Sequence, residues 1–271
     1  PTEKRAQVDG LDIFYAEAGD GPPVLLIHGF PVSSRIWSQV IGPLSQAHRV
    51  IAVDVPGFGE SACPPAFSYD FVGFADAIAG FLAQVGAKPA AIVGHSMGGA
   101  IALATTVLHP GSASRLVLVD ALAYPKPLPL EGRLALMPIV GPFLFKKLYR
   151  KANLMRFFRR DVYVDPAKAT EEMVGYFWKC LERPGGKEAA YRTLCALGDV
   201  EPIAELPPRV ACPSLIVWGE GDKVFPLAHG ERLAREIPGA RLEVIRGAGH
   251  SPIDERAEDF LARVTPFLAP S

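Results

Sequence analysis

The chain has 271 residues, with 28 Lys and Arg against 29 Asp and Glu, which gives a formal net charge of −1. Hydrophobic residues at 49% and charged residues at 21% are typical of a globular enzyme with one large domain, or with one domain that carries an insertion. This charge balance excludes a global electrostatic argument for binding nucleic acid or an anionic membrane.

The first segments of the chain predict a β-hairpin followed by a series of buried strands. The hairpin strands, 5–8 and 11–18, flank Asp9-Gly10, a dipeptide that tolerates the positive φ angles of a tight turn. Later apolar runs are too short for helices, and their continuous apolarity predicts parallel strands buried on both faces. These runs are 24–27, 50–53, 90–93, 116–119, 215–218 and 242–245.

Helical patterns separate most of these runs, at 33–44, 70–85, 97–108, 227–237 and 255–267. Alternation of strands and helices predicts an α/β fold in which a mostly parallel central sheet has helices on both faces.

One interval, 122–205, lacks any strand-like run. A structureless loop of this length is improbable in a compact domain, so we expect an inserted, mainly helical cap between the core segments 1–121 and 206–271. The cap contains a basic stretch, 146–160, with no acidic residue. We favour a solvated helical face over a membrane-binding surface for this stretch, because acidic residues follow it. They are Asp161, Asp165, Glu171 and Glu172.

The four cysteines show no CxxC pair and no metal-ligand spacing, so we expect apolar fillers and no metal site or cofactor. No apolar run approaches the ~20 residues of a membrane span, and no apolar segment follows the polar start of the chain. These features predict a soluble, cytoplasmic protein with a small-molecule substrate and without nucleic acid or stable membrane association. The sequence does not indicate an oligomeric state.

Ser96 is the strongest candidate for a chemical role. It lies in Gly94-His95-Ser96-Met97-Gly98, between a predicted strand and a predicted helix. Such a turn exposes a serine nucleophile, and small residues two places before and after it let strand and helix approach closely. The helix N-terminus and the Met97 N–H would favour a developing negative charge. The side chain of His95 is expected to point away from this site.

Together with His28-Gly29-Phe30 after the first buried strand, this turn resembles the α/β-hydrolase family, in its serine esterase and carbon–carbon hydrolase branch. The resemblance covers essentially the whole chain except the cap. It implies that the N–H groups of Phe30 and Met97 form an oxyanion hole. The turn 54–61 also resembles the family, and we expect it to be structural.

The general base is predicted to be His250, which follows the last strand run on a Gly-rich loop. Active sites of open α/β sheets gather at this carboxyl edge. Asp222 follows the preceding strand and matches the family's acid position, so the order Ser96, Asp222, His250 is the one typical of this fold. Two other carboxylates, Asp120 and Glu220, remain alternatives for the acid.

The resulting hypothesis is a serine hydrolase that cleaves small to medium apolar carboxylic esters through an acyl-enzyme. Apolar cap residues between 134 and 158 would supply part of the pocket. We expect the opposite wall to be formed by His28, Gly29, Trp37 and Phe225. The resemblance also admits a lactonase or a carbon–carbon (diketone) hydrolase, for which a cap arginine such as Arg192 could bind a substrate carboxylate. A ligand-sensing receptor on the same scaffold is a further alternative.

Overall fold

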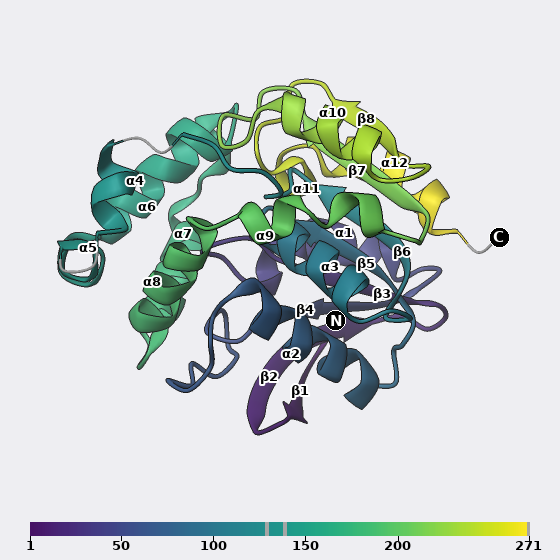
Figure 1. Ribbon diagram of the computed structural model, residues 1–271, viewed down its shortest axis with the longest axis horizontal. Helices are drawn as coiled ribbons and strands as arrows, with labels where there is room; N and C mark the ends of the chain where they lie inside the picture. Colours follow the sequence, from purple (N-terminus) through teal and green to yellow (C-terminus); the bar gives the residue numbers. More distant parts are fainter. Residues whose placement is uncertain (128–129, 138–139, 270–271) are drawn as a thin grey trace.

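An eight-stranded sheet forms the centre of the molecule (Figure 1). The structure is a computed structural model that describes residues 1–127, 130–137 and 140–269. The strand order is β1-β2-β4-β3-β5-β6-β7-β8; the first two strands are antiparallel to their neighbours and all others are parallel. The strands are β1 (Thr2–Val8), β2 (Leu11–Ala18), β3 (Pro23–Ile27), β4 (Arg49–Val53), β5 (Ala90–His95), β6 (Ala113–Val119), β7 (Ser214–Gly219) and β8 (Arg241–Ile245).

These strands confirm the predicted hairpin and the predicted mostly parallel sheet. Asp9 and Gly10 join β1 to β2 with φ angles of 49° and 81°, so the turn uses the left-handed backbone that this dipeptide tolerates. Every residue of β5 and β7 is buried, which explains why these strands read as uninterrupted apolar runs.

Helices cover both faces of the sheet. Because parallel crossovers are right-handed, the connection from β3 to β4 lies on one face, while those from β4 to β5 and from β5 to β6 lie on the other. The chain therefore reverses direction between β3 and β5, and ligand sites of open α/β sheets form at such a point. The core helices are η1 (Ser34–Trp37), α1 (Ser38–Leu44), α2 (Phe71–Gln84), α3 (Met97–Leu108), α10 (Leu227–Glu236), α11 (Pro252–Glu255) and α12 (Ala257–Leu268).

Two predicted helices differ in detail from the observed ones. The helix predicted at 33–44 begins as a 3₁₀ turn, capped by the Ser33 hydroxyl, which accepts a hydrogen bond from the Arg35 N–H at 3.3 Å. The helix predicted at 255–267 corresponds to α12, which begins at Ala257, because Arg256 with its φ of −136° separates α12 from the short helix α11 before it.

The described residues between β6 and β7 form helices and no strand, as predicted for the cap (Figure 1). Its first residues still belong to the core, because the buried Tyr124 donates a hydrogen bond to Glu236 of α10 at 2.7 Å. The division into two domains therefore stays a prediction. The helices of this interval are α4 (Leu130–Ala135), α5 (Val140–Phe143), η2 (Leu144–Leu148), α6 (Lys151–Phe157), η3 (Phe158–Val162), η4 (Pro166–Lys168), α7 (Glu171–Glu182), α8 (Gly186–Leu197), α9 (Glu201–Ala204) and η5 (Pro207–Arg209).

Acidic residues balance part of the basic stretch 146–160. Lys151 pairs with Glu171 at 2.8 Å, and Arg160 pairs with Asp161 at 3.0 Å. Lys146 pairs with Glu188 on α8. No helix in the described parts of the chain has the length and apolarity to cross a bilayer.

Candidate active site

Ser96 occupies a strained turn between β5 and α3. Its φ of 56° and ψ of −118° lie outside the regions that non-glycine residues normally adopt. The turn is tight because a Cβ at Gly98 would lie 2.3 Å from the Ile27 carbonyl oxygen. A Cβ at Gly94 would likewise lie 2.2 Å from the Gly98 carbonyl oxygen. The small residues flanking the serine are thus required by close backbone approach, as the sequence predicts.

His250 and Asp222 extend a hydrogen-bonded chain from this serine. His250 Nε2 lies 2.9 Å from Ser96 Oγ, and His250 Nδ1 lies 2.9 Å from Asp222 Oδ2. Asp222 Oδ1 accepts the backbone N–H groups of Val224 at 2.6 Å and Phe225 at 3.0 Å. Burial raises the pKa of Asp222, but the adjacent His250 and the Phe225 N–H outweigh burial and leave that pKa below its usual value.

The two alternative acids, Glu220 and Asp120, do not form the hydrogen bond to His250 Nδ1 that Asp222 forms. Glu220 is exposed and accepts the Gly247 N–H at 3.3 Å. Asp120 is fully buried and uses one oxygen to accept the Gly219 N–H at 2.9 Å. Asp222 is therefore the carboxylate that meets His250.

The remaining histidines lie elsewhere in the fold. His48 contacts the backbone carbonyls of Leu44 and Leu268 at the end of α12, at 3.3 and 3.2 Å. His109 pairs with Asp76 at 2.8 Å, and His229 on α10 packs against aromatic rings. Geometry thus selects His250 as the histidine that reaches Ser96.

The segment after β3 lies beside the serine, at the point where the chain reverses direction in the sheet. A Cβ at Gly29 would be 2.9 Å from the Cβ of Ser96, so only glycine fits there. His28 is fully buried beneath this segment, where its Nε2 accepts the Val55 N–H at 3.1 Å. Burial lowers the pKa of His28. This ring is a support of the loop.

His95 does not point away from the site, and that expectation is wrong. Its ring centroid lies 5.1 Å from that of His250, and its Nε2 lies 2.7 Å from the His250 carbonyl oxygen. Burial and the neighbouring charge of His250 lower the pKa of His95 to about 3. A neutral imidazole with its proton on Nε2 therefore fixes the backbone of His250. The direction of this side chain depends on packing between β5 and the loop after β8, which no local pattern reports.

A cavity of about 10 Å³ adjoins His250, large enough for about one water molecule. It is mostly apolar, and three of its residues come from the cap. Its lining residues are Phe30, Val32, Ile36, His95, Phe157, Phe158, Val162, His250 and Ser251.

None of the residues expected on the opposite wall of the pocket, His28, Gly29, Trp37 and Phe225, lines this cavity, and neither does Ser96, so their assignment to the substrate pocket stays a prediction. Trp37 is fully buried, and its ring packs edge-on against His95. The rings of Phe225 and His250 form a T-shaped contact, with their centroids 5.3 Å apart.

Glu255 is a further residue of the site that sequence reasoning missed. Its buried carboxylate accepts the Gly249 N–H at 2.7 Å and the Asp165 N–H at 2.8 Å. The His250 N–H in turn donates to the Val162 carbonyl oxygen at 2.7 Å. These bonds attach the histidine loop to the cap. A glutamate near a helix start carries no local signal for this role.

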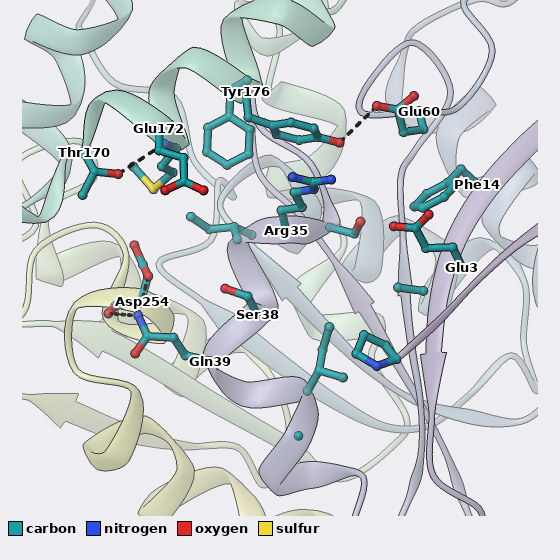
Figure 2. Close-up of a pocket in the computed structure, with 18 of the residues that line it drawn as sticks. Glu3, Phe14, Arg35, Ser38, Gln39, Glu60, Thr170, Glu172, Tyr176 and Asp254 are labelled. Atoms are coloured by element: carbon teal, nitrogen blue, oxygen red, sulfur yellow. Dashed lines mark hydrogen bonds between the residues drawn. The ribbon is translucent and has the colours of Figure 1, made fainter.

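A much larger open cleft, of about 1330 Å³, shares one lining residue, Ile36, with this cavity. In this cleft the Arg35 guanidinium lies over the ring of Tyr176, and the Tyr176 hydroxyl donates to Glu60 (Figure 2). The Arg35 Cζ is 3.8 Å from the ring centroid, and the hydrogen bond is 3.2 Å long. Gln39 closes another side through a 2.7 Å hydrogen bond to Asp254. The cleft contains neither Ser96 nor His250.

Only one group of side chains within the described residues has the spacing of a metal site. It comprises Asp120, Asp222 and His250, whose ligand atoms lie within 4.8 Å of one another. Both ring nitrogens of His250 already contact Ser96 and Asp222, so the imidazole has no free nitrogen for a metal ion.

A doubly wound sheet with a strained strand–serine–helix turn at its reversal point is typical of hydrolases of the α/β type. A family model described as the alpha/beta hydrolase family matches residues 24–264, and the chain belongs to this family.

Relatives and solved structures span more than one hydrolase activity. An uncharacterized hydrolase, YugF, of Bacillus subtilis is 30% identical over 98% of this chain and 97% of its own length. A 2-hydroxy-6-oxononadienedioate/2-hydroxy-6-oxononatrienedioate hydrolase of a Pseudomonas species is 31% identical over 93% of this chain and 90% of its own length. A thermophilic esterase from Thermogutta terrifontis superposes with a TM-score of 0.78 and 26% identity, covering 99% of this chain and 98% of that one.

Proposed function

We propose that Ser96, His250 and Asp222 form the catalytic triad of a serine carboxylesterase. The observation that carries the proposal is the unbroken hydrogen-bonded chain from Ser96 Oγ through the imidazole to Asp222, with 2.9 Å at each step. Nucleophile, base and orienting acid need this mutual geometry before any pKa argument applies.

In this mechanism Ser96 Oγ attacks the ester carbonyl carbon while His250 Nε2 takes the hydroxyl proton. Asp222 holds the Nδ1 proton and stabilises the imidazolium that forms. His250 then gives its proton to the leaving alcohol, and an acyl-enzyme remains on Ser96. Water, deprotonated by His250, attacks that ester and releases the carboxylic acid and the free serine. The chemistry requires neither a metal nor an organic cofactor.

The tetrahedral intermediate carries a negative oxygen that needs donors. The Met97 N–H stands first in α3, where backbone N–H groups have no acceptor within the helix. The Phe30 N–H belongs to the segment that approaches Ser96 through Gly29. We assign these two N–H groups to the oxyanion hole, where loss of one donor typically reduces the rate by ~10²- to 10³-fold.

A small to medium apolar ester is the substrate class that the lining favours. Phe30, Phe157 and Phe158 dominate the cavity wall, and no lysine or arginine among the described residues lines it. The cavity is small, so binding of such an ester requires the cap or Ile36 to move. The similarity to an esterase supports the same reading.

Carbon–carbon hydrolysis of a diketone is the second candidate, favoured by the 31% identical relative. A substrate with a carboxylate would need a cation beside the cavity. Arg192 cannot serve from its position, because it donates to the carbonyl oxygens of Pro65 at 2.7 Å and Ser68 at 3.2 Å. Lactones, as cyclic esters, remain compatible with the proposed mechanism.

The decisive experiment compares wild type with Ser96→Ala on p-nitrophenyl esters of increasing acyl length and on a vinylogous diketone. We expect turnover of the short and medium esters, covalent labelling of Ser96 by a fluorophosphonate, and loss of both in the variant. Activity retained in Ser96→Ala would refute the nucleophile assignment. Preference for the diketone would favour the second candidate, and labelling without turnover would favour a ligand-sensing protein.

A further inference from the structure

Asp120 is a buried acid next to the proposed triad that the mechanism above does not use. It directly follows β6, is fully buried, and has a φ of 43°, an unusual value for a non-glycine residue. Its backbone N–H donates to the Val217 carbonyl oxygen at 3.0 Å, and its Oδ1 accepts the Gly219 N–H at 2.9 Å. Two hydrogen bonds to the neighbouring strand β7 thus hold Asp120, one to its backbone and one to its carboxyl.

The other oxygen, Oδ2, is buried and receives no hydrogen bond from any donor in the described part of the chain. Asp120 belongs to a group with Asp222 and His250 in which one carboxyl oxygen or ring nitrogen of each residue lies within 4.8 Å of those of the other two. Two buried carboxylates at this separation cannot both be ionised without a large repulsion. One of the pair must hold a proton.

The hydrogen-bond donors around each carboxyl decide which of the two, Asp120 or Asp222, holds the proton. Asp222 accepts two backbone N–H groups and the His250 Nδ1 proton, all of which favour its ionised form. Asp120 accepts only the Gly219 N–H. In agreement, burial and the nearby charge of Asp222 raise the pKa of Asp120 well above its usual value.

We propose that Asp120 is a positioning residue that keeps its proton at neutral pH and donates its Oδ2–H to the Asp222 carboxylate. This inference rests on the proposed triad. The O–H gives Asp222 a fourth donor, fixes the rotation of its carboxylate, and keeps a second negative charge away from His250. Because a carboxylate with more donors is less basic, Asp120 also limits how strongly Asp222 stabilises the imidazolium.

Other titratable groups also act on Asp222 and must be held constant in a test. They are His95 on β5, Lys126 after β6 and His229 on α10. None of them replaces the missing donor to Asp120 Oδ2. Substitutions at Asp120 therefore alter the interaction between Asp120 and Asp222 and leave these three neighbours unchanged.

The test uses two substitutions of different chemistry. Asp120→Ala removes the donor. Asp120→Asn retains a neutral donor, because its amide NH₂ can face Asp222 while its oxygen accepts the Gly219 N–H. We expect Asp120→Ala to lower kcat/KM for a p-nitrophenyl ester by roughly 10- to 100-fold, as misplacement of a catalytic group does. Without the fourth donor, the acid limb of its pH profile should move to higher pH by at least about 0.5 unit.

Asp120→Asn should retain most of the wild-type kcat/KM, and the acid limb of its pH profile should lie at the wild-type pH. A merely structural role would lower thermal stability without moving the limb, so an unmoved limb in Asp120→Ala overturns the proposal. Equal losses in both variants would also overturn it, because they would indicate that Asp120 acts as a carboxylate.

A second measurement does not depend on the folding of Asp120→Ala. The infrared difference spectrum of wild type minus Asp120→Asn at pH 7 should contain the carbonyl stretch of a protonated carboxyl, and its absence overturns the inference. Fluorophosphonate labelling of Ser96 separates the two proposals. If Ser96 is not labelled, the proposed function fails; if it is labelled while the Asp120 results are negative, only this inference fails.

Discussion

Replacing Glu255 by alanine should test whether the histidine loop depends on the cap. The carboxylate accepts the Gly249 N–H at 2.7 Å and the Asp165 N–H at 2.8 Å. Hydrogen bonds to charged groups contribute ~1.5 to 3 kcal/mol each. Loss of both, in a residue only 7% exposed, should lower the free energy of unfolding by roughly 3 to 5 kcal/mol.

Activity should fall as well, because Gly249 adjoins His250. A released loop lets the imidazole move relative to Ser96, and a displacement of about 1 Å can reduce the rate ~10²-fold. We therefore expect kcat/KM to drop by about 10- to 100-fold at temperatures where the variant is folded.

The free energy of unfolding is measured by urea denaturation at pH 7, monitored by circular dichroism. The matched control is Glu231→Ala, an exposed glutamate on α10 that should change stability by at most about 0.5 kcal/mol. If Glu255→Ala unfolds within about 1 kcal/mol of wild type and keeps its kcat/KM, the two bonds do not hold the loop and the reasoning is refuted.

Four further outcomes are expected. Asp222→Asn should reduce kcat by about 10⁴-fold in steady-state assays, because the amide favours the wrong tautomer of the imidazole; a loss below tenfold would contradict the assignment. Unfolded His95 takes up a proton below its ordinary pKa of 6.5, whereas folded His95 does so only near 3. Stability is therefore lost as pH falls, and between pH 7 and 5 the unfolding free energy of wild type should drop by about 2 kcal/mol more than that of His95→Gln. Ile36→Ala should open the wall between cavity and cleft and raise kcat/KM for long-chain relative to short-chain esters by about tenfold; an unchanged chain-length profile would exclude that route. Because ion pairs balance part of the stretch 146–160, liposomes of anionic lipid should not pellet the protein at physiological salt, and pelleting there would contradict the solvated-face interpretation.

The sequence by itself determined the sheet, the order of its helices and the position of the elbow. Each of these depends on short-range patterns: continuous apolar runs for buried strands, Asp9-Gly10 for the hairpin turn, and small residues on either side of Ser96. The predicted nucleophile, base and acid also meet in space, because the carboxyl ends of parallel strands lie along one edge of the sheet.

Tertiary structure decided which side chains surround those three groups. His95 turns toward His250, Glu255 reaches the histidine loop, and Asp120 lies against Asp222. Each contact joins residues from different elements, and its direction depends on how those elements pack, so no periodicity along the chain reports it. The burial of Trp37 has the same origin, since its ring packs against Phe260 of α12 in the core.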